Sequence, residues 1–143
     1  MNNINPLNTL TASTFALALK TQNFHWNVQG INFAPLHAMF EEQYDALYEQ
    51  VDVLAERVRA LGQTSLGGLQ AYLDVSIVKD APEGVGAEDM IAILAQDHQT
   101  LSRHLVEAAA DFGDAKDAVT EDMLIGMAQE HDKTVWMLKA HLV

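Results

Sequence analysis

Residues 35–62 read PLHAMFEEQYDALYEQVDVLAERVRALG, and they form the clearest helical pattern in the sequence. Pro35 suits the first turn of a helix, and Gly62 suits the position just after a helix end. The spacing predicts a helix of about 27 residues, roughly 40 Å long, and a helix of that length in a small chain indicates a bundle. Apolar residues recur every three or four positions, with Tyr44 at the one skipped position: Leu36, Phe40, Leu47, Val51, Leu54, Val58 and Leu61.

The same periodicity appears on both sides of this stretch. Before it, Asn5 as a cap and Pro6 as the first helical residue predict a helix that runs to about Val28 and stops at Gly30. After it the pattern loosens, and residues 66–73 are compatible with a short helix inside a long crossover.

Two more helices follow the crossover. The first is expected from about Glu88, with acidic residues in its first turn, to Gly113. The second is expected from Thr120 almost to Val143. Two helix pairs joined by one long crossover predict an all-α, ferritin-like four-helix bundle, with a short helix between the second and third long helices. No repeat or low-complexity segment divides the chain, so we expect a single domain over residues 1–143.

The composition narrows the classes of function. Asp and Glu outnumber Lys and Arg by 20 to 8, which gives a net charge of −12. Such a surface repels nucleic-acid phosphates, and it either attracts cations or serves only solubility. Cysteine is absent, which excludes thiolate chemistry and disulfides. Neither a membrane span nor a signal peptide is apparent, so a cytoplasmic location is expected.

Two histidines lie among the apolar positions of the last two long helices. They are His98 and His131, and no carboxylate occupies a neighbouring core position. The chain also has no Glu-x-x-His motif, the pattern with which bundles hold two metals in their core. We therefore interpret both histidines as hydrogen-bonded core residues rather than metal ligands.

Another set of residues suits a divalent metal. His25 and His37 fall at the end of the first long helix and the start of the second, so antiparallel packing places them at the same end of that pair. Glu41, Asp52 and Glu56 share a flank of the second helix. Asp52 lies about 22 Å beyond His37 along that helix, too far for one ion. Either a two-fold partner completes a shared site, or the histidines and acids are ordinary surface residues.

Three motifs stand out along the chain. The first runs from HWNVQG at 25–30 through LH at 36–37 to Glu41. The second runs from VDVLAER at 51–57 to LG at 61–62, and the third covers residues 131–142. Together they resemble the Dps family, the ferritin-like DNA-binding proteins from starved cells, and the resemblance covers essentially the whole chain.

The resemblance implies a hollow dodecamer built from two-fold dimers, with a ferroxidase centre at each two-fold interface. His25 and His37 of one subunit and Asp52 and Glu56 of the other would be the iron ligands, with Glu41 beside the metal. Fe(II) would be oxidised, preferentially by hydrogen peroxide, and the Fe(III) stored as mineral. The implied roles are iron storage, iron homeostasis and protection against oxidative stress.

Three more residues acquire expected roles through the resemblance. Trp26 adjoins His25 and is a candidate for electron transfer, with interface packing as the alternative. Asp117 and Asp122 resemble acids that line three-fold pores through which iron reaches the cavity in this family. Acidic residues at a helix start are also ordinary partners of the helix dipole.

DNA binding is the competing function that the resemblance brings. Members that condense DNA commonly use Lys- or Arg-rich tails, which would make this chain an architectural protein of the nucleoid with a secondary metal site. This sequence contains no basic cluster at either end, and its net charge is −12. We therefore expect weak or absent DNA binding.

Overall fold

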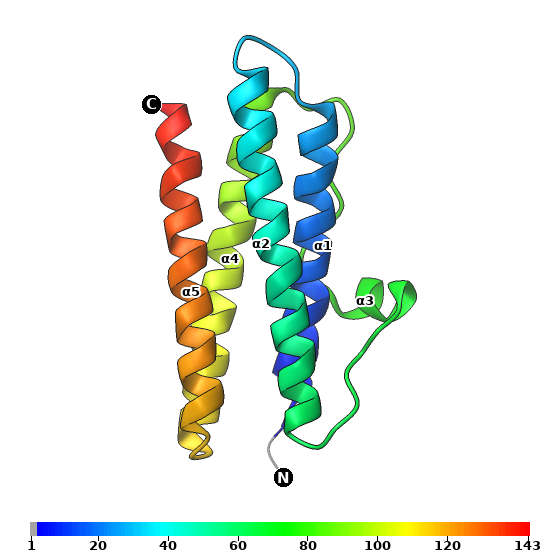
Figure 1. Ribbon diagram of the computed structural model, residues 1–143, viewed down its shortest axis with the longest axis vertical. Coiled ribbons are helices and arrows are strands. Elements are labelled where there is room, and N and C mark those ends of the chain that lie inside the picture. Colours follow the sequence, from blue (N-terminus) through cyan, green and yellow to red (C-terminus); the bar gives the residue numbers. More distant parts are fainter. Residues whose placement is uncertain (1–2) are drawn as a thin grey trace.

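The computed structural model describes residues 3–143 and shows a bundle of four long helices (Figure 1). The helices are α1 (Asn5–Asn27), α2 (Phe33–Ala60), α3 (Leu69–Val75), α4 (Ala87–Asp114) and α5 (Ala118–Lys139), followed by the 3-10 turn η1 (Ala140–Leu142). The pairs α1–α2 and α4–α5 are each antiparallel, and the crossover between them carries α3 beside α1. The predicted ferritin-like bundle with a short helix in its crossover is confirmed.

The helix starts differ from the predicted ones by one or two residues. Ile4, not Asn5, precedes the first turn of α1, so Asn5 is itself helical and Pro6 follows it. The second long helix begins at Phe33 rather than Pro35, because the amide of Phe33 already donates to the carbonyl of Gly30 at 3.1 Å. Gly30 allows this tight reversal with a φ of 114°, which side chains with a Cβ rarely adopt.

The junction of α4 and α5 also corrects two expectations. Gly113 does not end α4, which continues to Asp114 and closes with Lys116 in the left-handed region at φ 67°. A Cβ at Gly113 would instead collide with the Glu121 carboxylate, so the glycine leaves room for that side chain of α5. The cap of α5 is Asp117 rather than Thr120, since the Asp117 carboxylate accepts from the Thr120 amide at 3.0 Å.

The core is a continuous apolar cluster contributed by all four long helices. It includes the predicted stripe of α2 apart from Val51 and Leu61, which are only partly buried. The helices are not packed equally closely. A groove of about 780 Å³ separates α2 from α5 and reaches into the core as far as His98 and His131. No helix within residues 3–143 combines the length and apolarity needed to cross a bilayer.

Candidate metal centre

His25 and His37 form a reciprocal pair where α1 ends and α2 begins. His25 Nδ1 lies 2.6 Å from the His37 carbonyl oxygen, and His37 Nδ1 lies 2.7 Å from the His25 carbonyl oxygen. The two rings stack with centroids 3.7 Å apart and planes inclined by 13°. The prediction that antiparallel packing brings these imidazoles together is confirmed.

This pairing determines which ring nitrogens are free. A carbonyl oxygen only accepts, so both Nδ1 atoms must carry the hydrogen and donate it. In neutral rings the Nε2 atoms of His25 and His37 then hold the lone pairs. Protein groups that fix a histidine tautomer in this way orient metal ligands, because the ring can bind only through its other nitrogen. The pair therefore presents two imidazole lone pairs at one end of the bundle.

Aromatic side chains hold the pair in place. Phe33 stacks on His37 with centroids 5.0 Å apart, and Tyr44 meets His25 edge-on at 5.2 Å. The Tyr44 hydroxyl donates to Glu41 at 3.4 Å, which places this carboxylate near the histidine pair. Tyr44 was not named as a site residue from the sequence. Its place at the skipped apolar position of α2 was a signal that it contacts something other than the apolar core.

Asp52 and Glu56 lie one turn apart on the exposed flank of α2. A hydrogen bond to Asp52 and the negative charge of that residue raise the pKa of Glu56. The two carboxyl groups are thus close enough to form a hydrogen bond when Glu56 is protonated. A bound cation would relieve the same repulsion, so this pair is a natural half of a metal site.

The structure does not unite the two halves within one chain. Among residues 3–143, no three His, Cys, Asp or Glu side chains are grouped closely enough to hold a metal. This agrees with the separation along α2 expected between His37 and Asp52. A complete site with both halves requires a second subunit.

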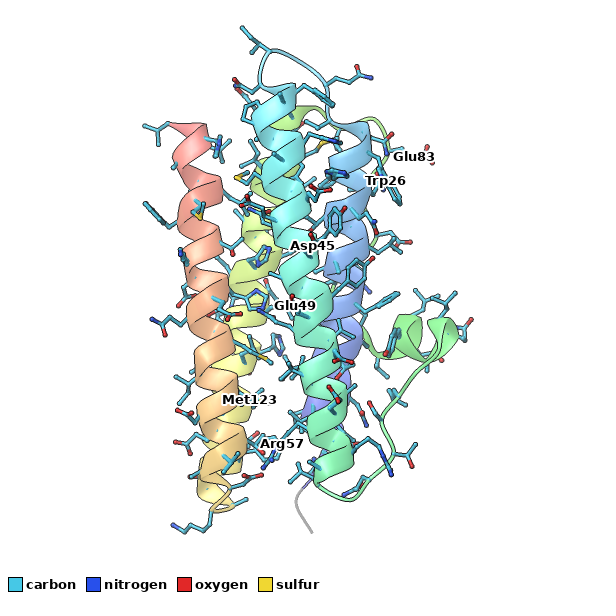
Figure 2. The ribbon with its side chains drawn as sticks, viewed as in Figure 1. Trp26, Asp45, Glu49, Arg57, Glu83 and Met123 are labelled. Carbon is cyan, nitrogen blue, oxygen red and sulfur yellow. The ribbon has the colours of Figure 1, made fainter. Side chains whose placement is uncertain are left out.

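The remaining candidates occupy separate places. Trp26 projects outward from α1 with 60% of its surface exposed (Figure 2). Asp117 is engaged at the start of α5, where it accepts from Thr120 and forms an ion pair with Arg57 at 3.3 Å. These contacts, with hydrogen bonds from Thr120 as the largest cause, lower the pKa of Asp117. Asp122 is exposed one turn farther along α5.

His98 and His131 are buried and hydrogen-bonded, as predicted, and the structure adds that they bond to each other, with their Nδ1 atoms 2.7 Å apart. Gln50 of α2 extends the contact, since its Oε1 lies 3.0 Å from His131 Nε2. Gln50 was not singled out from the sequence. The signal in the sequence was a glutamine on the side of α2 that faces the rest of the bundle.

Known proteins share both the fold and the sequence pattern. The family model of the ferritin-like domain matches residues 4–143. The chain is 34% identical over 139 residues to DNA protection during starvation protein 2 of Bacillus anthracis, covering 97% of this chain and 95% of that protein. The crystal structure of Dps from Staphylococcus aureus superposes with a TM-score of 0.95 at 43% identity, covering 98% and 94% of the two chains.

A Dps protein from Vibrio cholerae, described as a member of a broad superfamily of ferritin-like diiron-carboxylate proteins, gives a TM-score of 0.94 at 30% identity. The match covers 98% of this chain and 88% of the Vibrio cholerae chain. This protein is therefore a ferritin-like helical bundle. Within that class, the chain belongs to the Dps family.

Proposed function

We propose that this protein is an iron-storage and detoxification protein that oxidises Fe(II) at centres shared between two subunits. In each centre, His25 and His37 of one chain bind iron together with Asp52 and Glu56 of the partner subunit. Glu41 assists from beside the histidine pair. Hydrogen peroxide is the preferred oxidant, and the Fe(III) produced is stored as mineral inside the assembly.

The reciprocal hydrogen bonds of His25 and His37 carry this proposal. They leave the Nε2 lone pairs of both imidazoles uncommitted, while the carboxylates that would complete the donor set lie on another part of α2. Imidazole and carboxylate together suit Fe(II) and leave coordination positions for an oxidant. The diiron-carboxylate description of the Vibrio cholerae relative supports the same chemistry.

The electron balance requires two Fe(II) ions for each peroxide. Each ion gives up one electron, the O–O bond breaks, and two protons convert the resulting hydroxides to water. Because both electrons are delivered together, no free hydroxyl radical is released. The chain's own contribution is to hold iron, to keep the imidazoles in one tautomer and to provide carboxylates that stabilise Fe(III).

A two-fold dimer is the smallest assembly that completes such a centre, and two centres would form in it. We propose a dodecamer of six such dimers, in keeping with the similarity to Dps structures over nearly the whole chain. The electron-transfer role of Trp26 and the pore role of Asp117 and Asp122 belong to this proposal.

Anaerobic loading with Fe(II), followed by stoichiometric peroxide, tests the reaction. Wild-type protein is expected to develop ferric absorbance rapidly. His37→Ala/Asp52→Ala is expected to slow oxidation at least tenfold, because it removes ligands from both halves of every centre. His104→Ala/Glu107→Ala is the matched control, since it deletes one exposed imidazole and one exposed carboxylate from α4.

The sharing of ligands has its own test. His37→Ala and Asp52→Ala subunits, dissociated and reassembled together, form some interfaces at which one of the two centres keeps all its ligands. Partial recovery of oxidation relative to either variant alone is expected. An unchanged rate in the mixture would show that the ligands do not come from two chains.

A further inference from the structure

The groove between α2 and α5 contains a buried nitrogen that the iron chemistry does not use. His98 is 2% exposed and lines this groove, yet its Nε2 atom has no hydrogen-bond partner. Gln43 Oε1 is a second buried acceptor without a donor, and it lines the same groove. Buried polar atoms are nearly always paired, so two orphaned acceptors on residues that line one groove point to something that binds there.

A chain of hydrogen bonds fixes the state of His98 Nε2. The Gln50 amide nitrogen donates to the Glu130 carboxylate at 2.7 Å, so Gln50 Oε1 faces His131 and accepts from its Nε2 at 3.0 Å. His131 Nδ1 is then the unprotonated atom of a neutral ring, and it accepts from His98 Nδ1 at 2.7 Å. His98 Nε2 is left with a bare lone pair.

His98 stays neutral at ordinary pH. Burial, with His131 as a second cause, lowers the pKa of His98 well below its usual range. A neutral imidazole whose other nitrogen is already donating is in the form in which histidine binds metals. A water molecule would be an alternative partner for the lone pair.

The rest of the groove decides which metal suits it. Thioethers line it from both walls: Met39 from α2, and Met123, Met127 and Met137 from α5 (Figure 2 labels Met123). Met127 lies one helical turn before His131 on the same face, and it is only 7% exposed. Thioethers and imidazole select soft ions such as Cu(I), whereas Mg²⁺ and Ca²⁺ require oxygen ligands.

We propose that the α2–α5 groove is a binding site for a soft monovalent metal ion, Cu(I) in its chemistry, held by His98 Nε2 and the Met127 thioether. Such an ion accepts few ligands, so one imidazole and one thioether form a chemically suitable donor set. This site lies within one subunit and shares no residue with the proposed iron centre. The proposal of a groove site is therefore independent of the proposal of a ferroxidase centre.

Anaerobic Cu(I) titration of the assembled protein against a chromophoric Cu(I) chelator tests the site. His98→Gln keeps an amide able to donate to His131 but removes the imidazole lone pair. Met127→Leu removes the thioether at nearly constant volume. Each is expected to abolish one Cu(I) equivalent per chain or to weaken its affinity by more than tenfold.

Two controls distinguish this site from other copper binding. Met90→Leu changes a methionine that is equally buried, at 4% exposure, but lies outside the groove, and it is expected to leave Cu(I) binding unchanged. His37→Ala/Asp52→Ala is expected to retain the groove site even if it loses Cu(I) bound at the subunit interface.

X-ray absorption at the copper edge supplies the second readout. Wild type is expected to show mixed nitrogen and sulfur scatterers, with the sulfur shell reduced in Met127→Leu. Unchanged stoichiometry and affinity in both groove variants would overturn the proposal, as would a copper shell of oxygen and nitrogen alone. Binding lost equally in Met90→Leu would also overturn it.

Discussion

At the scale of single residues, the buried pair of His98 and His131 links stability to pH. Burial lowers the pKa of His131 from 6.5 to about 4. Between these values the unfolded chain binds protons that the folded chain excludes, so stability is full above about pH 6.5 and falls as the pH approaches 4. For His131 alone the loss reaches about 3 kcal/mol.

Urea unfolding at fixed protein concentration, at pH 7 and pH 5, measures this effect. Wild type is expected to be less stable at pH 5, while His98→Leu/His131→Leu is expected to show a flatter dependence because neither ring can titrate. His104→Leu, which removes an exposed histidine, should keep the wild-type slope. The assignment would be wrong if the double variant and wild type lost stability equally.

Asp52 and Glu56 provide a second residue-scale prediction. Because Asp52 raises the pKa of Glu56, Asp52→Asn is expected to return the Glu56 pKa toward its ordinary value of 4.5. Carboxyl carbon chemical shifts of the metal-free protein, followed through a pH titration, measure this change. Asp45→Asn changes another exposed acid of α2 and should leave Glu56 unaffected.

At the scale of elements, a buried ion pair joins α1 to α4. Lys20 lies 2.7 Å from Asp97, and their side chains are only 5% and 20% exposed. Burial raises the pKa of Asp97, while Lys20 acts against that rise. Removing one partner leaves a buried charge uncompensated, which costs more than removing both.

Asp97→Leu is therefore expected to destabilise the protein by about 3 kcal/mol, and Lys20→Met/Asp97→Leu by clearly less. Urea unfolding at pH 7 compares them. Lys20→Met is measured as well. If the destabilisation of the double variant equals the sum of those of Lys20→Met and Asp97→Leu, the two side chains do not stabilise the fold as a pair.

The start of α5 separates a structural role of Asp117 from a role in iron passage. Asp117→Ala is expected to lower the free energy of unfolding by about 1 kcal/mol, because it removes the side chain that caps α5 by accepting from the Thr120 amide. Asp117→Asn keeps an accepting oxygen and should preserve most of that stability. If Asp117 also conducts iron, Asp117→Asn will slow mineral formation although most of the stability is kept, and Asp122→Asn will act in the same direction.

At the scale of the whole molecule, net charge opposes DNA binding. With −12 per subunit, we expect no retardation of duplex DNA in gels at moderate salt in the absence of divalent cations. A salt-sensitive shift without divalent cations would favour the DNA-compacting alternative. If the protein protects DNA only by removing iron, peroxide damage to the DNA will fall without any change in its mobility in the gel.

Much of the molecule was predictable from local pattern. The periodicity of residues 35–62 predicted α2, and its length indicated a bundle before any contact was known. Helix ends were less accurate, because hydrogen bonds outside the periodic segment set them. Gly30 and Lys116 close such turns, and a lysine in the left-handed region at position 116 has no sequence signal of its own.

The helices, the pairing of chain segments, the net charge and the candidate iron ligands could be predicted from the sequence, since they follow from spacing and composition along the chain. Which imidazole nitrogens are free could be seen only in the folded structure. His25 and His37 are 12 residues apart, His98 and His131 are 33 apart, and Gln50 and His131 are 81 apart. Hydrogen bonds across such separations depend on how helices pack, and those bonds set the tautomers from which both proposed metal sites derive.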